Sequence, residues 1–339
     1  MSAEPPLDRA ALVGVARSRY GLEVEQATFL PDGTAHAYRL EGPGGRVFAK
    51  VIPDTPSGQQ LTRSLLAELP LLKVLRGEAL LPRVPQALTT LDGESLARVE
   101  GYALILYQWI EATNLSSAWE GALTELAPLL GRLHAATPRI LAAVQTLPAP
   151  PETFELPLDD LDRDLAALRQ LGRGARPGLR ALKALLAPHE PAIGRLAARL
   201  RHFQGVARRR PPRLVVCHTD AHGGNVMRDA AGQLWLVDWA TARLAPPEHD
   251  LWMLHARLPQ VLPAYQAEVG AALHPDPDLL GFYLCRRPLE DLAADLYWAL
   301  HEHTRAQQDE ATLDILTRFV LPAVQRAEDE LDQLTAALG

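Results

Sequence analysis

The sequence predicts an α+β fold in two parts: a small antiparallel sheet with one inserted helix, then a larger and mostly helical part. Two patterns predict this division. Short apolar runs separated by glycine-rich turns occupy roughly the first hundred positions, a pattern typical of antiparallel strands. Apolar residues at three- and four-residue spacing dominate the rest, a pattern typical of helices. We place the boundary between positions 107 and 108, so the expected parts are 1–107 and 108–339.

The first part is expected to contain two helices and a set of strands joined by tight turns. The helices are expected over residues 7–20 and 58–76. The strands are expected over residues 23–30, 35–41, 47–52, 86–91, 96–99 and 102–107. Of these, 86–91 and 96–99 should form a hairpin around the turn at 92–94. Pro70 should start, kink or break the second helix, because proline lacks the N–H that an interior helical position donates.

The second part is expected to be helical with one interruption. The helices are expected over residues 117–137, 158–171, 178–203, 260–271, 277–303 and 308–338. The interruption consists of two short apolar runs, 213–217 and 233–237, around a turn at 229–232. These runs are expected to form a second hairpin.

Composition excludes several classes of protein. With 47% hydrophobic and 22% charged residues, the 339-residue chain is an ordinary globular protein. It has no apolar run near the roughly 20 residues that a membrane helix needs, and its opening residues, MSAEPPLDRA, show no secretory signal. Two cysteines suggest a reducing compartment, so we expect a cytoplasmic location. The net charge of −7 argues against nucleic-acid binding and suits a small cationic partner.

Lysine is scarce in this chain. Of the 34 basic residues only Lys50, Lys73 and Lys183 are lysines. Since the compact ammonium and the planar guanidinium are not interchangeable, a lysine at a functional position carries more information here than usual. Lys50 is such a lysine, because it lies within the strand expected over 47–52.

The strongest chemical signal is residues 217–225, which read CHTDAHGGN, followed by Asp238 at the end of an expected strand. The spacing is His-x-Asp-x-x-x-x-Asn. Phosphoryl transfer from ATP needs a carboxylate beside the attacking hydroxyl and oxygen ligands for Mg²⁺. Asp220 can orient the hydroxyl and accept its proton. Asn225 and Asp238 can converge on one metal ion.

These residues resemble a known family. Residues 218–225 and 234–239 are similar to the catalytic loop and metal-binding aspartate of kinase-fold small-molecule phosphotransferases, the aminoglycoside phosphotransferase and choline kinase-like family. Residues 244–251 (LAPPEHDL) and 282–292 (FYLCRRPLEDL) are similar to the spectinomycin phosphotransferases within it. The resemblance extends over nearly the whole chain, in the expected order.

The resemblance implies a bilobal, protein-kinase-like fold that uses ATP and Mg²⁺. Residues 1–107 would be the nucleotide-binding N-lobe, and 108–339 the C-lobe with the catalytic loop and the substrate-binding helices. Lys50 follows alanine, as the lysine of the protein-kinase Val-Ala-Ile-Lys motif does, and would contact the ATP phosphates. Its helix partner would be Glu68, or Glu78 if Pro70 bends the helix.

Further roles follow from the same resemblance. A phosphate-covering loop at 31–36 would use its one glycine, Gly33, and the hinge would bind adenine. The hinge residues are Gln108, Trp109 and Ile110. Three residues would support the catalytic loop: His218 and Asp250 would brace it, and His222 would approach the transferred phosphate. For His222, a solvated surface histidine without a role is an equally good interpretation. For the hinge residues, a plain core strand is an equally good interpretation.

The acceptor is the least determined element. Glu290, Asp291 and Asp295 share an acidic helix face that could receive an amine-bearing sugar or cyclitol, although such faces are often only solvated. An aminocyclitol antibiotic such as spectinomycin is the leading acceptor. A choline-, amino-acid- or sugar-like endogenous metabolite is the alternative, because a shared fold does not fix the acceptor.

Three other functions are less consistent with the sequence. A protein kinase needs an activation segment, and only 11 residues separate Asp238 from Asp250. A metal-dependent hydrolase could use His218, Asp220 and His222 with His301 or His303, but the chain lacks the His-Glu-x-x-His spacing. A non-catalytic nucleotide-binding protein usually loses its lysine, base or metal ligands, which are all present here. The oligomeric state is not predicted.

Overall fold

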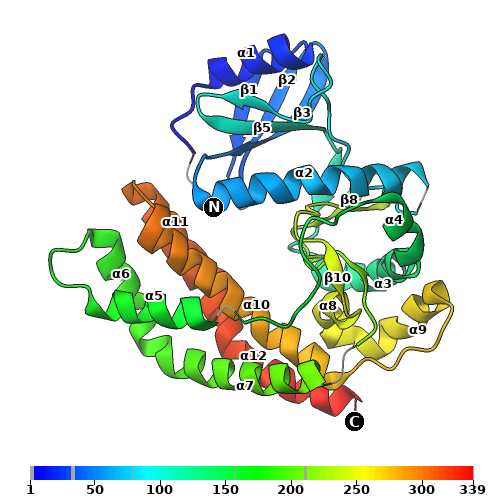
Figure 1. Cartoon of the computed structure of the whole chain (residues 1–339), viewed down its shortest axis with the longest axis vertical. Helices are drawn as coiled ribbons and strands as arrows, with labels where there is room; N and C mark the ends of the chain where they lie inside the picture. The colour runs from blue at the N-terminus through cyan, green and yellow to red at the C-terminus, as the bar shows by residue number, and fades with distance from the viewer. Residues whose placement is uncertain (1–3, 32–34, 79, 157, 210–211, 339) are drawn as a thin grey trace.

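The structure is a computed structural model of the chain, and it describes residues 4–31, 35–78, 80–156, 158–209 and 212–338. It confirms the predicted α+β class, with an antiparallel sheet at one end of the molecule and helices in most of the rest (Figure 1).

A five-stranded antiparallel sheet forms the first part, in the order β1-β2-β3-β5-β4. Its strands are β1 (Gln26–Leu30), β2 (His36–Gly42), β3 (Gly45–Ile52), β4 (Ala97–Val99) and β5 (Tyr102–Gln108). Side chains alternate between the two faces of a strand. On β5, Leu104 packs in the cluster with α1 (Arg9–Tyr20), whereas Ile105 packs in the cluster with α2 (Pro56–Gly77). Lys50 pairs with Ile105 across the strands, so it lies on the α2 face.

Helix α2 continues past Pro70, so the expectation that this proline starts or breaks the helix is wrong. Leu65, Leu71 and Leu75 on its inner side are fully buried in the cluster beneath the sheet. This packing offsets the missing backbone hydrogen bond. The same inner side carries Glu68, which is only 2% exposed.

Residues 86–91 do not form the expected hairpin with 96–99. Ala87 makes a single bridge to Tyr107 of β5, while β4 pairs with the other end of β5, at residues 102–104. Both segments therefore align against one edge of β5 instead of against each other. Strand β5 ends at Gln108, one residue beyond the predicted boundary. The division of the chain between 107 and 108 stays a prediction.

The second part is built from ten α-helices among the described residues. They are α3 (Trp119–Ala135), α4 (Thr137–Ala143), α5 (Leu158–Gln170), α6 (Pro177–Leu186), α7 (Glu190–Arg209), α8 (Glu248–Leu251), α9 (Leu258–Val269), α10 (Pro277–Tyr297), α11 (Ala306–Ile315) and α12 (Leu321–Leu338). Short 3₁₀ or π turns follow four of them: η1 (Ala187–His189), η2 (Trp252–Arg257), η3 (Trp298–Glu302) and η4 (Leu316–Val320). The expected helix 178–203 is thus two helices, and 308–338 is interrupted by a π turn.

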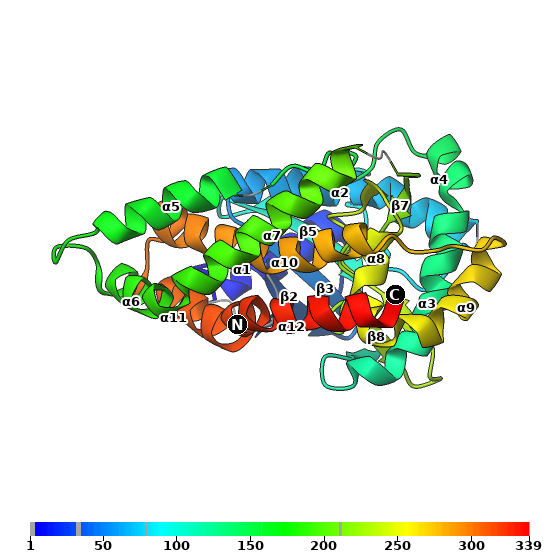
Figure 2. The same cartoon turned by 90° about the horizontal axis from the view of Figure 1, so that it is seen from below.

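The helices form two packed groups. Helices α3 and α9 lie together below α2 and share its apolar cluster (Figure 1). Helices α5, α7, α10 and α12 pack in a second cluster that extends to one side, as the view from below shows (Figure 2). None of the helices within the described ranges is both long and apolar enough to cross a membrane.

Five short strands lie between these groups and carry the loop singled out in the sequence. They are β6 (Ala112–Asn114), β7 (Val215–Cys217), β8 (Val226–Asp229), β9 (Leu234–Leu236) and β10 (Arg243–Ala245). The expected pairing of 213–217 with 233–237 is wrong: β9 pairs with β8, and β7 pairs with β10. The hairpin turn at 229–232 is nevertheless where the sequence placed it, because Gly232 has a φ of 78° and its N–H bonds to the Asp229 carbonyl.

Candidate active site

The side chain of Lys50 joins the two parts of the chain. Its Nζ lies 2.9 Å from Oδ1 of Asp238, a residue 188 positions later. Burial, the largest single influence, lowers the pKa of Lys50, but Asp238 and Glu68 outweigh it and the pKa is raised. Lys50 in turn lowers the pKa of Asp238. An ammonium and a carboxylate therefore face each other, both charged, where the sheet meets the helical part.

Glu68 lies beside this pair without forming a hydrogen bond to the lysine. Its Oε1 accepts a 2.6 Å hydrogen bond from the Tyr107 hydroxyl. Its buried Oε2 has no partner at full hydrogen-bond geometry among the described residues, although the main chain of Trp239 lies near the carboxylate and lowers its pKa. Burial raises the pKa of Glu68 to about 7, and Lys50 opposes the rise. The alternative partner, Glu78, pairs with Arg139 at 2.9 Å on the surface. Of the two candidates, Glu68 is the one near Lys50.

Asp220 and Asn225 are joined within the loop between β7 and β8. The Asn225 Nδ2 donates to both the main-chain oxygen and the Oδ2 of Asp220, each at 2.9 Å. The amide therefore faces Asp220 with its nitrogen, which leaves its Oδ1 turned away. Val237 donates its N–H to the Asn225 carbonyl at 2.9 Å, and this bond holds Asp238 next to the loop.

A buried carboxylate supports the loop from below. Asp250 is fully buried, and its two oxygens accept from the N–H groups of His218 and Thr219 at 3.0 and 2.6 Å. His134 approaches the same carboxylate with Nε2 at 2.9 Å and contacts the Tyr265 hydroxyl with Nδ1 at 2.7 Å. The sequence offered no signal for His134, because it lies on α3, far along the chain.

The ring of His218 is placed inside the loop. Its Nδ1 accepts from the Asp220 N–H at 3.2 Å, so Nε2 is the nitrogen that donates to the Val237 carbonyl at 3.0 Å. Burial lowers the pKa of His218, and its ring contacts Trp239 edge-on at 4.5 Å. The neutral ring therefore connects the main chain of Asp220 to that of Val237, the residue before Asp238.

His222 folds back over its own turn. Its Nδ1 accepts from the Gly224 N–H at 2.9 Å, and its Nε2 lies 3.6 Å from Oδ1 of Asp220. A Cβ on Gly223 would lie 2.9 Å from the Leu115 carbonyl oxygen, so only glycine fits there. Nearly half of the His222 side chain is exposed.

Two site residues have strained backbones. Thr219 and Asp238 have φ angles of 73° and 65°, in the left-handed region that non-glycine residues rarely occupy. Such strain persists only where surrounding contacts fix the chain, and it is concentrated at functional sites. Here the Asp250 carboxylate fixes Thr219, and Lys50 contacts Asp238.

The donor set fits a magnesium ion. Mg²⁺ prefers carboxylate and amide oxygens, and Asp238 Oδ2 and Asn225 Oδ1 have no hydrogen-bond partner within the described part of the chain. Within the ranges that the structure describes, His134, Cys217 and Asp250 form a group whose ligand atoms lie close enough together to hold an ion. In this group the Asp250 carboxylate is already hydrogen-bonded to the His134 ring and to the N–H groups of His218 and Thr219.

A pocket of about 420 Å³, including its open mouth, lies against Asp220. Ten described residues line it: Thr219, Asp220, Thr241, Arg243, His249, Trp252, Tyr283, Arg286, Arg287 and Glu290. Arg287, on α10, contacts Oδ1 of Asp220 directly and Oδ2 of Asp291 at 2.9 Å. Arg287 was not predicted as a site residue, although its i,i+4 spacing from Asp291 could have indicated the pair.

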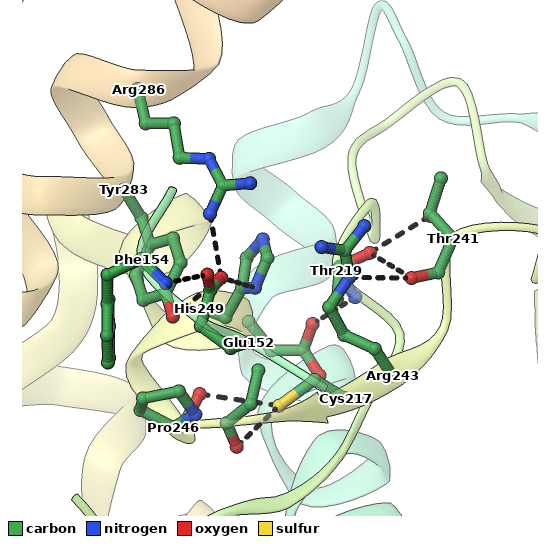
Figure 3. A network of polar contacts seen from close by, with 12 residues as sticks. Glu152, Phe154, Cys217, Thr219, Thr241, Arg243, Pro246, His249, Tyr283 and Arg286 are labelled. Atoms are coloured by element: carbon green, nitrogen blue, oxygen red, sulfur yellow. Dashed lines mark hydrogen bonds and ion pairs between the residues drawn. The ribbon is translucent and has the colours of Figure 1, made fainter. Parts of the chain in front are cut away.

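Buried Glu152 is the centre of a polar network on one side of this pocket (Figure 3). Its Oε2 accepts from Arg286 at 2.7 Å and from the Tyr283 hydroxyl at 3.3 Å. His249 stacks on Tyr283 with ring centroids 4.0 Å apart. Burial and three nearby arginines hold the pKa of His249 well below its usual range, so this ring is neutral.

The three predicted substrate acids are in different situations. Glu290 lines the pocket but pairs with Arg286 at 2.6 Å, and Asp291 pairs with Arg287. Asp295 is buried and does not line the pocket. Burial, with some help from Asp291, raises the pKa of Asp295 to about 7. The predicted open acidic face is therefore already largely neutralised.

The predicted adenine hinge follows β5. The Gln108 N–H bonds to the Gln86 carbonyl at 2.8 Å, and the Ile110 carbonyl accepts from Ala112 at 2.9 Å. The Arg46 guanidinium lies over the Trp109 ring, with its Cζ 5.7 Å from the ring centroid. Their nucleotide role stays a prediction, and Gly33 lies outside the described residues.

The histidines invoked for a hydrolase do not meet. His301 pairs with Asp164, and His303 with Asp309, both at 3.0 Å. Their partners lie on α5 and α11, whereas His218 and His222 lie in the loop between β7 and β8.

The sequence profile of the phosphotransferase enzyme family matches residues 26–283. The chain belongs to this family. It is accordingly a small-molecule phosphotransferase with an alcohol group as acceptor, which confirms the predicted enzyme class and the resemblance.

Relatives of this phosphotransferase include the protein StrN of Streptomyces griseus, which is 26% identical over 248 residues, or 68% of this chain and 69% of StrN. Among solved structures, spectinomycin phosphotransferase in complex with ADP and spectinomycin has a TM-score of 0.69 at 19% identity, covering 96% of this chain and 99% of that one. Choline kinase LicA of Streptococcus pneumoniae has a TM-score of 0.56 at 14% identity, covering 96% and 98%. These likenesses show the bilobal kinase-like fold.

Proposed function

We propose that this phosphotransferase moves the γ-phosphoryl group of ATP to a hydroxyl group of a small molecule, with Mg²⁺ held by Asn225 and Asp238. The observation that carries the proposal is the Lys50–Asp238 ion pair, 2.9 Å long, next to the Asp220–Asn225 hydrogen bonds. A cation for phosphate, oxygen ligands for a metal and a carboxylate for a hydroxyl thus occur together.

The chain's residues divide the work of the transfer. Asp220 accepts a hydrogen bond from the acceptor hydroxyl and takes its proton as the new oxygen–phosphorus bond forms. The bond from the γ-phosphorus to the bridging oxygen breaks, and ADP leaves. Lys50 binds phosphate oxygens, and the neutral His218 keeps the Asp220 main chain in place. Positioning and charge neutralisation supply most of the rate.

Bound Mg²⁺ would neutralise phosphate charge. Support for ATP as donor comes from solved relatives in complex with ADP or AMP, among them spectinomycin phosphotransferase and LicA. For this chain both ligands are part of the proposal.

Two acceptor classes are carried forward. The likeness to spectinomycin phosphotransferase supports an aminocyclitol, as the sequence suggested. The second class is an endogenous metabolite. Glu290 and Asp291, the acids assigned to a cationic acceptor, are already paired with Arg286 and Arg287, so they do not select between the two classes. Relatives such as choline kinase LicA and an aminopropanol kinase support small metabolites as acceptors in this fold.

The test is ADP release from Mg·ATP against a panel of acceptors, with the phosphorylated product identified by mass spectrometry. The panel contains spectinomycin, other aminocyclitols, aminoglycosides, choline, aminopropanol, homoserine and simple sugars. Transfer to at least one hydroxyl compound, lost in Asp220→Asn, is expected. A wild-type protein that binds no Mg·ATP would overturn the proposal.

A further inference from the structure

Arg243 differs from the other two arginines of the pocket. Arg286 is shared by Glu152 and Glu290, and Arg287 by Asp220 and Asp291. Arg243 has no carboxylate within ion-pair distance among the described residues. Its Nε makes one long hydrogen bond, 3.3 Å, to the Thr241 carbonyl. Its terminal nitrogens are therefore free to bind a ligand.

The position of Arg243 is fixed relative to the site of transfer. It lies on β10 and pairs across the strands with Cys217 of β7. Three residues after Cys217 comes Asp220, and both Arg243 and Asp220 line the same pocket. A molecule whose hydroxyl reaches Asp220 therefore has a guanidinium close to another of its groups.

The surroundings of Arg243 suit a charged group that has lost part of its water. The pocket that Arg243 lines is also lined by the rings of His249, Trp252 and Tyr283. The His249 ring is neutral, and its buried Nδ1 lies 3.7 Å from Oε2 of Glu152, beyond hydrogen-bond distance. The two carboxylates that line the same pocket, Asp220 and Glu290, are paired with Arg287 and Arg286.

We infer that Arg243 is the specificity-determining residue for the acceptor, and that it binds an anionic group, a carboxylate or a phosphate, on the molecule whose hydroxyl faces Asp220. The planar guanidinium matches both anions with two parallel N–H donors. Arg286 and Arg287 offer no surplus charge, because each is shared by two carboxylates. This inference rests on the proposed function and names the acceptor class within it.

The test uses four three-carbon alcohols that differ in one group: glycerate, glycerol 3-phosphate, glycerol and 3-amino-1,2-propanediol. Their binding to the enzyme in the presence of Mg·ADP is measured by calorimetry. We expect an anionic probe to bind roughly 10- to 100-fold more tightly than glycerol, the range that charge-assisted hydrogen bonds support. The order of glycerate and glycerol 3-phosphate tells which anion the pocket takes.

Variants locate the effect. Arg243→Ala should abolish the preference for the anionic probe and leave glycerol binding unchanged, and Arg243→Lys should restore part of it. Arg257→Ala is the matched control, because this half-exposed arginine pairs with Glu120 and does not line the pocket. Unchanged Mg·ADP affinity verifies that each variant is folded. If Arg243→Ala does not fold, Arg243→Gln takes its place.

Equal binding of all four probes, absence of binding, tighter binding of the amine, or a preference that survives Arg243→Ala would each overturn the inference. The proposed function fails differently, by loss of Mg·ATP binding in the wild type. A kinase that phosphorylates only neutral or cationic alcohols would keep the proposed function and lose this inference.

Discussion

The part of the site around Lys50 and the part around Asp220 are stabilised in different ways. Lys50 has one ion-pair partner, Asp238, and neighbouring Glu68 has an oxygen with no partner at full hydrogen-bond geometry among the described residues. The Asp220 loop instead has its main-chain N–H groups bound by buried Asp250. Lys50 has three N–H donors and uses one of them on Asp238, so donors remain where charged phosphates are proposed to bind. Bonding capacity is filled where a carboxylate must be held in one orientation.

This comparison predicts its largest effect at Asp220. Asp220→Ala should lower kcat by roughly 10²- to 10⁴-fold, the contribution typical of a positioned base. Nucleotide affinity should change little, because Lys50 and Asp238, which are proposed to bind the nucleotide and its metal, belong to the other part of the site. Rates come from ADP release with an acceptor identified in the panel, and affinities from calorimetry. Near-wild-type turnover would remove the base assignment.

The next largest effect is expected in stability, at Asp250. Asp250→Ala leaves the N–H groups of His218 and Thr219 buried without partners, which should lower the free energy of unfolding by roughly 2–5 kcal/mol. Asp160→Ala is the control, because Asp160 forms an exposed ion pair with Arg163, worth about 0–1 kcal/mol. Denaturant unfolding measures both. Equal losses would show that the loop is not held by Asp250.

A smaller effect, in the pH dependence of stability, is expected at Glu68. Its pKa is about 7 in the folded protein against an ordinary 4.5, so the folded state holds a proton that the unfolded state has lost. Stability should therefore fall as the pH rises from 4.5 to 7, by roughly 3 kcal/mol at most.

Glu68→Gln should remove that part of the slope. Asp295, whose pKa burial also raises to about 7, remains in both proteins, so the difference between them isolates Glu68. Glu78→Gln, which removes only the exposed pair with Arg139, is the control. Identical pH profiles for wild type and Glu68→Gln would contradict the burial of an uncompensated carboxyl group.

The sequence predicted the parts of the site that local patterns encode. Residues 217–225 are contiguous, and two short strands fix their ends, so spacing alone indicated that Asp220 and Asn225 act together. Lys50 was expected within the strand 47–52, and the structure has it in β3 (Gly45–Ile52). The fold class followed from the change of apolar period beyond residue 115.

What the sequence could not give depends on contacts distant along the chain. The contacts of Arg287 with Asp220, and of His134 with Asp250, join residues 67 and 116 positions apart. Residues 86–91 alternate like a strand, but which edge they pair with depends on where β5 lies. The predicted acidic face failed as an open surface because arginines one turn earlier on α10 pair with it.

The most direct test measures nucleotide affinity against Mg²⁺ concentration in three proteins: wild type, Asp238→Ala and Asp220→Ala. In the proposed site Asp238 and Asn225 hold the metal and Asp220 faces the acceptor hydroxyl. Mg²⁺ should therefore tighten ATP binding equally in wild type and Asp220→Ala, and Asp238→Ala should lose this effect. An undiminished Mg²⁺ effect in Asp238→Ala, or its loss in Asp220→Ala, would contradict the assignment.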